Sequence, residues 1–224
     1  MTQEIKIEKK ASEVIQPDSI EEAREAITTK KDLSGAKLAG MKLAGLTAVG
    51  AILRKTDLSS SDLSHGLLMK PNFYKAKLES AEIHNTILVS GDLVKSDFKN
   101  ANLSNTALVN PDAQDANFEG ALMRNTALVS ANLQNANFTN AKLNNAWIAS
   151  SNVTGADFTG ADLSGARGHN TNWSMAKVPP STLPQPLLQV PKWAYPVLIG
   201  SILSMISLII YALVKKQKKS EKQP

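Results

Sequence analysis

The stretch Ala156-Asp157-Phe158-Thr159-Gly160-Ala161-Asp162-Leu163-Ser164-Gly165 holds two copies of a five-residue unit that repeats from Asp32 to Trp173. From Leu33 to Trp173 the centre of each unit is an apolar residue or glycine, which gives 29 units with no insertion or deletion, and the residue two places earlier is mostly small. The consensus is A-(D/N)-(L/F)-x-x. A period of five fits neither an α-helix nor a simple β-strand, and self-similarity this strict predicts a solenoid.

The composition limits the classes of function. The net charge of +5 comes from the C-terminal end, where Lys192 and five tail lysines outnumber Glu221. The rest of the chain is neutral, so we expect no basic face that binds nucleic acid. The absence of cysteine excludes disulfides and thiolate chemistry. The first residues contain no apolar segment, so we expect no signal peptide.

The repeat resembles the pentapeptide-repeat family over about residues 31–175. That resemblance implies an all-β solenoid, a right-handed four-sided parallel β-helix in which four successive units make one coil. In the family, the central apolar residue and the small residue two places before it point inward, and the other three point outward. Coils in a β-helix are about 4.8 Å apart, so about seven coils would make a rod of roughly 34 Å.

Sorting the repeat into columns of 20-residue spacing predicts which side chains stack. One column of centres ends in four phenylalanines, as ring stacking would require: Phe98, Phe118, Phe138 and Phe158. An outer column carries four amides that can hydrogen-bond from coil to coil: Asn85, Asn105, Asn125 and Asn145.

One wall of the predicted β-helix is apolar on its outside. We call its outward residues the apolar wall: Val49, Leu67, Met69, Ile87, Val89, Ala107, Val109, Ala127, Val129, Trp147 and Ala149. A continuous exposed apolar patch usually marks a contact with protein or membrane. We predict that the partner interface consists of Leu67, Met69, Ile87, Val89, Val109, Val129 and Trp147. Two alternatives remain open: selection for strand propensity alone, and cover by the chain's own N-terminal arm or Pro-rich segment.

The sequence before the repeat predicts a cap. Residues 1–17 are polar and form a flexible arm, and residues 18–30 form a helix that Ser19 and Glu22 begin as a capping box. Its apolar face is Ile20, Ala23, Ala26 and Ile27. Because the end of a solenoid exposes unpaired backbone, we expect this helix to cover it. At the other end the repeat lapses at Gly168, and Trp173 with Met175 would close it.

The C-terminal part predicts a membrane anchor. Residues 176–194 form a Pro-rich linker, residues 195–214 a transmembrane helix and residues 215–224 a basic tail. Val197 to Val214 is an uncharged run of 18 residues that spans about 27 Å as a helix. Gly200, Ser204, Ser207 and Tyr211 share one helical face, which suits packing against another membrane helix; the alternative is that lipid simply tolerates these residues. The positive tail favours a cytoplasmic C-terminus, whereas a late-emerging anchor without an export signal favours a cytoplasmic β-helix, which we prefer.

No constellation of residues indicates an enzyme, a cofactor, a metal or a small-molecule substrate. The Asp residues of the consensus belong to the repeat, and we interpret them as solvated groups on its outer walls. His65 and His84 would lie on adjacent coils, but two histidines without a third ligand make an incomplete metal site. We therefore expect no catalytic, cofactor-binding or metal residues.

Three functions compete at this point. The first is a membrane-anchored scaffold that presents the apolar wall to a protein partner or to a second copy. The second is an assembly or regulatory factor of a membrane complex, recognised through its transmembrane helix; the resemblance makes a photosynthetic membrane one setting, since family members are abundant in cyanobacteria. The third is a gyrase-binding DNA mimic, which in the family relies on a strongly negative surface that this chain lacks.

Overall fold

The computed structural model describes residues 15–186, and the chain divides into two compact units, residues 1–185 and 186–224. The described part contains the helix α1 (Ile20–Thr28), the 3₁₀ turn η1 (Trp173–Met175) and eight short strands. The strands are β1 (Thr47–Val49), β2 (Leu67–Met69), β3 (Ile87–Val89), β4 (Ala107–Val109), β5 (Ala127–Val129), β6 (Trp147–Ala149), β7 (Arg167–His169) and β8 (Gln185–Pro186).

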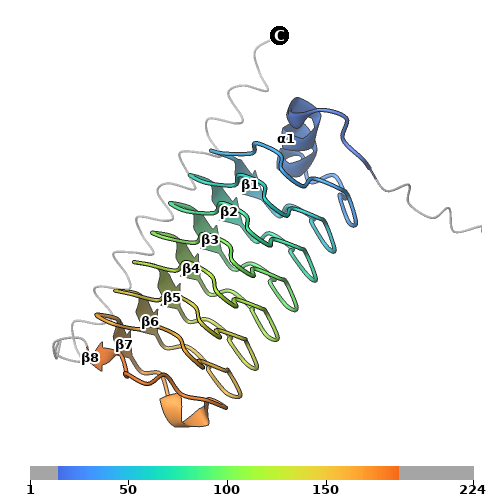
Figure 1. Ribbon diagram of the computed structural model, residues 1–224. Helices are drawn as coiled ribbons and strands as arrows, with labels where there is room; N and C mark the ends of the chain where they lie inside the picture. The colour runs from blue at the N-terminus through green and yellow to red at the C-terminus, as the bar shows by residue number, and fades with distance from the viewer. Residues whose placement is uncertain (1–14, 187–224) are drawn as a thin grey trace, which may run out of the picture. The chain divides into compact units, whose positions relative to one another are not determined.

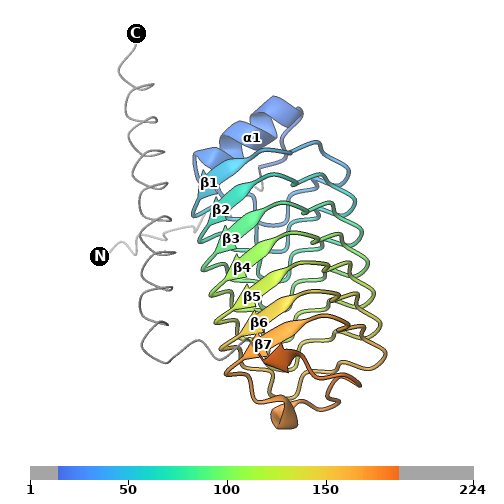
Figure 2. The same ribbon diagram turned by 90° about the vertical axis from the view of Figure 1, so that its left-hand side faces the viewer.

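The repeat forms a four-sided parallel β-helix. Strands β1 to β7 stack in sequence order on one wall, each in parallel register with the strand of the next coil. The three other walls are joined by single parallel bridges with the same spacing, for example Asp32–Ile52, Lys37–Asp57 and Lys42–Asp62. Figures 1 and 2 show the coils as a regular stack with the strand arrows in one row.

The stack makes six full turns between β1 and β7, because each strand begins one coil after the strand before it. About seven coils were expected; incomplete turns precede β1 and follow β7, since the parallel bridges of the other walls run from Asp32 to Val178. The predicted β-solenoid and its 20-residue period are confirmed.

The core follows the predicted division between inward and outward residues. The central residues and the small residues before them are buried from Leu33 to Ala166, apart from the half-buried Met41. Ala48 is a small centre, and Leu46 fills the adjacent inward position. The rings of Phe98, Phe118, Phe138 and Phe158 are stacked with centroids 5.0, 4.9 and 4.8 Å apart, which confirms the predicted column.

Several inward small residues are Thr or Ser, and their hydroxyls tie one coil to the next. Thr106 Oγ1 donates to the carbonyl of Ile83 at 2.8 Å, and Thr126 Oγ1 donates to the carbonyl of Leu103 at 2.7 Å. No buried side-chain N or O atom lacks a partner within residues 15–186. Because an unpaired buried hydroxyl would cost about 1–3 kcal/mol, these bonds let the narrow core accept a polar residue.

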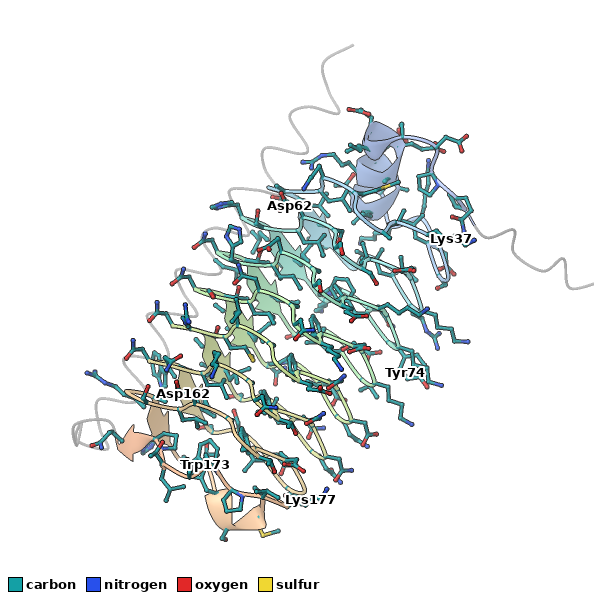
Figure 3. All side chains as sticks on the ribbon, in the orientation of Figure 1. Lys37, Asp62, Tyr74, Asp162, Trp173 and Lys177 are labelled. Carbon is teal, nitrogen blue, oxygen red and sulfur yellow. The ribbon has the colours of Figure 1, made fainter. Side chains whose placement is uncertain are left out.

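The Asp and Asn before each centre hold the corners of the coil. Asp157 accepts hydrogen bonds from the backbone N–H of Thr159 at 3.0 Å and from its hydroxyl at 2.6 Å. The same arrangement recurs at Asp62 with Ser64; Asp62 and Asp162 mark one edge of the stack in Figure 3. The sequence suggested merely solvated outer carboxylates, whereas the structure shows side chains that fix a turn.

These bonds make the stability of the β-helix depend on pH. Side-chain hydrogen bonds are the largest cause that lowers the pKa of Asp32, Asp57, Asp62, Asp157 and Asp162 below the ordinary Asp range. A folded-state pKa below the unfolded value gives stability that is present above the unfolded pKa and lost as pH falls through the folded one.

We expect the free energy of unfolding, measured in urea, to be constant from pH 7 to 5 and to fall below about pH 4. In Asp157→Asn, which keeps an acceptor without a charge, this fall should be smaller; an equal fall would show that Asp157 does not contribute.

The helix α1 covers the open end of the first coil, as predicted (Figure 1). Ser19 is its N-cap and accepts from the N–H of Glu22 at 3.1 Å, while the Glu22 carboxylate accepts from the N–H of Asp18 at 2.9 Å. Ala23, Ala26 and Ile27 are fully buried on the core. Ile20, the first residue of the helix, was expected on the same face but is 37% exposed.

The other end is closed partly by residues that the sequence suggested were linker. Trp173 packs edge-on against Phe158 at 5.4 Å, and the N–H of Phe158 donates to the carbonyl of Val178. The N–H of Gln185 in β8 donates to the carbonyl of Ala166, and Pro184 lies 3.0 Å from where a side chain at Gly168 would begin. The β-helix thus extends beyond residue 175 to Pro186, because its last coil otherwise leaves backbone groups unpaired. Figure 3 shows Trp173 and Lys177 at this end.

The predicted arm and anchor fall largely beyond the described residues. Residues 1–14 of the arm, residues 187–194 of the linker, the predicted transmembrane helix 195–214 and the tail lie outside them. Between residues 15 and 186 no helix has the length and apolarity needed to span a bilayer.

Candidate functional site

The apolar wall is the outer surface of strands β1 to β6. In each strand the central residue is buried and the two flanking residues face outward, with burial patterns that place most of them as half-buried or exposed. Ile87, Trp147 and Val49 are the most open, at 43%, 40% and 39% of their surface. Ala149 is the exception, since it is buried. The predicted interface residues therefore share one surface.

Strand propensity explains part of this composition. Within residues 15–186 this is the wall that forms three-residue strands, and Val and Ile are favoured in strands. Thr has a similar strand propensity and a polar side chain, and this chain has it at the inward positions Thr86, Thr106 and Thr126. Between β2 and β6 no outward position of the wall is Thr, and Leu67 and Met69 are not strand-favouring residues. Propensity alone therefore does not account for the apolar wall.

Polar ladders border the apolar wall on both sides, and the sequence interpretation recognised one of them. Asn85, Asn105, Asn125 and Asn145 precede the strands, and within this column Asn125 Nδ2 donates to Asn105 Oδ1 at 3.0 Å. On the other side the strands are followed by Ser90, Asn110, Ser130 and Ser150. These eight corner residues have positive φ. The apolar wall is thus two side chains wide and sharply bounded by polar residues.

The remaining sites named from the sequence are placed as follows. The rings of His65 and His84 pack edge to face with their centroids 5.3 Å apart, and His84 Nε2 lies 3.9 Å from Glu82 Oε2. Among the described residues there is no group of three or more side chains that could hold a metal ion. Gly200, Ser204, Ser207 and Tyr211, the predicted packing face of the membrane helix, lie outside the described residues.

The charge of the described part is balanced. Residues 15–186 contain 16 Lys and Arg against 16 Asp and Glu. The ion pairs among them include Lys99–Glu119 at 3.1 Å and Lys177–Asp157 at 3.3 Å. Like charges do not dominate the surface, so steering of a strongly charged partner is not favoured.

The solved structures that match the chain include a fluoroquinolone resistance protein and two pentapeptide repeat proteins. A trypsin-treated variant of QnrB1, a plasmid-mediated fluoroquinolone resistance protein, has 27% identity, covers 65% of this chain and 76% of its own, and has a TM-score of 0.46. A pentapeptide repeat protein from the Arabidopsis thaliana thylakoid lumen has 29% identity, coverage of 49% and 70%, and a TM-score of 0.37. HetL, from the cyanobacterium Nostoc and involved in heterocyst differentiation regulation, has 19% identity, coverage of 75% and 99%, and a TM-score of 0.25. No curated protein sequence matches the chain.

Family models identify the repeat directly. The model of pentapeptide repeats in eight copies matches residues 32–68, and the model of the pentapeptide repeat region matches residues 91–167. Together they cover just over half of the 224 residues. With the 20-residue coils and the stacked centres, these matches show that the chain belongs to the pentapeptide repeat family.

Proposed function

We propose that this protein is a non-enzymatic interaction module that presents the apolar wall to a protein partner. The observation that carries the proposal is the concentration of outward apolar side chains on one wall of the β-helix, where five successive strands carry them, whereas the other walls have isolated ones such as Leu122. Exposed patches of this kind commonly mark interaction sites. The balanced charge of residues 15–186 disfavours both nucleic-acid binding and the strongly negative surface of a gyrase-binding DNA mimic.

The finer part of the proposal is a single-pass anchor at residues 195–214, with the β-helix on the cytoplasmic side. It rests on the uncharged run Val197 to Val214 and on the flanking lysines. Protease access to the β-helix in sealed vesicles tests the orientation. Replacing residues 195–214 by an unrelated apolar helix distinguishes two roles for this segment. If it is a plain anchor, partner binding should stay intact. If a membrane complex recognises it through Gly200 and Ser204, that recognition should be lost.

Site-directed crosslinking tests the main proposal, because the chain has no cysteine of its own. Val109→Cys and Val129→Cys place a photoreactive maleimide on the apolar wall, and Gln114→Cys and Gln134→Cys place it on a polar wall of the same two coils. In native membranes or mild detergent, we expect both wall positions to crosslink to the same partner protein and the two control positions not to. Equal crosslinking from all four positions, or none from the wall, would contradict the proposal.

A further inference from the structure

The width of the apolar wall restricts what can bind there. Each strand contributes two outward side chains, two residues apart, so the two rows are about 7 Å apart. From Val49 to Ala149 the wall covers six coils, or about 24 Å. The apolar surface is therefore a strip about 10 Å wide, which matches the diameter of an α-helix.

The bordering ladders limit the partner further. The amides of Asn105, Asn110 and Asn125 form some bonds within the ladders, but each amide has more donors and acceptors than these bonds use. A broad flat partner would have to supply a matching partner for every free donor and acceptor of the ladders, because each one left unpaired out of water costs free energy. A narrow partner that stays between the ladders avoids this cost.

The area argues in the same direction. The area of an apolar strip of about 24 by 10 Å is well below the roughly 800 Å² of surface that each partner buries in a standard stable interface. A second copy pressed flat against this wall would thus gain too little apolar contact for a stable dimer. A single helix of about 16 residues is about 24 Å long and would use the whole strip.

The outward side chains of the apolar wall differ in size from strand to strand, so the wall should favour certain side chains on its partner. In the row nearest the strand starts, Ala107 and Ala127 are small, and they lie between Ile87 and Trp147, which are 43% and 40% exposed. This row is therefore lower at β4 and β5 than at β3 and β6 beside them, while the other row carries Val109 and Val129 on the same strands. A bound helix fits best with large apolar side chains over β4 and β5 and small ones near Ile87 and Trp147.

We propose that the occupant of the apolar wall is an amphipathic helix of a partner protein, with an uncharged apolar stripe whose largest residues lie over β4 and β5. The length of the strip sets the length of this helix at about 16 residues. This inference rests on the proposed function and names the class of partner. The chain's own run Val197 to Val214 is a poorer match, because it is apolar on nearly all sides and the strip would leave most of its surface in water.

Synthetic peptides binding to the full-length protein test the inference. The probe is a fluorescent 18-residue helix with a Leu-centred apolar stripe. Its controls have the same composition, one with a central proline and one scrambled into strand-like alternation. We expect the helical peptide to bind at least 10-fold more tightly than either control, and to crosslink to a photoreactive group at Val109→Cys but not at Gln114→Cys. Equal binding of the three peptides would overturn the inference, as would crosslinks at Val109→Cys to a second copy or to residues 195–214 in place of the peptide.

A size exchange makes the test specific. Ala107→Leu with Ala127→Leu fills the low positions on β4 and β5, so we expect at least 10-fold weaker binding of the Leu-centred peptide and recovery with an Ala-centred one. If the natural partner depends on the wall but no helical peptide binds, the helix inference fails and the proposed function stands. If neither the natural partner nor the peptide depends on the apolar wall for binding, both the helix inference and the proposed function fail.

Discussion

Phe118→Ala should lower the free energy of unfolding by about 3–5 kcal/mol, more than the other single substitutions considered below. Phe118 is fully buried in the middle coil, and its ring is stacked between Phe98 at 5.0 Å and Phe138 at 4.9 Å. A solenoid is stabilised by contacts between neighbouring coils, so the cavity weakens the interfaces on both sides. Urea unfolding followed by circular dichroism measures the loss.

Two matched variants separate the cavity from other effects. Phe118→Leu keeps an apolar residue that the same column already uses at Leu58 and Leu78, and it should cost less than about 2 kcal/mol. Val109→Ala removes an apolar side chain from the outer surface and should change stability by less than about 1 kcal/mol. A cost below about 1 kcal/mol for Phe118→Ala would show that the phenylalanine column does not hold the coils together.

Val89→Lys, Val109→Lys and Val129→Lys together should lower partner binding at least 100-fold. The three residues form one row on β3, β4 and β5, and bound lysines there would be desolvated without a counter-charge. Each such charge costs several kcal/mol in an apolar contact, while about 1.4 kcal/mol already corresponds to a 10-fold change in affinity. Titration of the purified partner, or its recovery in a pull-down, measures the effect.

The control for charge is the triple variant Gln114→Lys, Gln134→Lys and Thr154→Lys. These residues also stack one coil apart, but on a polar wall, so they add the same charge with the same spacing. We expect this variant to bind the partner normally and both variants to unfold at similar temperatures. Normal binding by the apolar-wall variant would remove the basis of the proposed function.

Most of the architecture could be predicted from the sequence because a repeat of five removes the usual ambiguity. Once four units make a coil, each position has a defined wall, a defined neighbour and a defined side. This is why the stacked phenylalanines, the outward direction of Val109 and Val129 and the capping role of Ala23 and Ala26 agree with the structure.

The ends and corners were less predictable. The sequence pattern stops before the fold does: Val178 and Gln185 complete the last coil after the five-residue spacing has been lost. The Asp and Asn of the consensus have no signature that separates a solvated carboxylate from one that accepts the N–H two residues later, as Asp157 does. Both depend on where backbone groups meet in space.

By itself, the sequence determined the solenoid, its period and which residues face outward on the apolar wall, because an uninterrupted period assigns every side chain to a column. The tertiary structure alone decided the width of that wall, the polar ladder on its second side and the exposed fractions of Ile87 and Trp147. These properties depend on the distance between strands and on which corners adjoin them, and a list of residue types does not contain those distances.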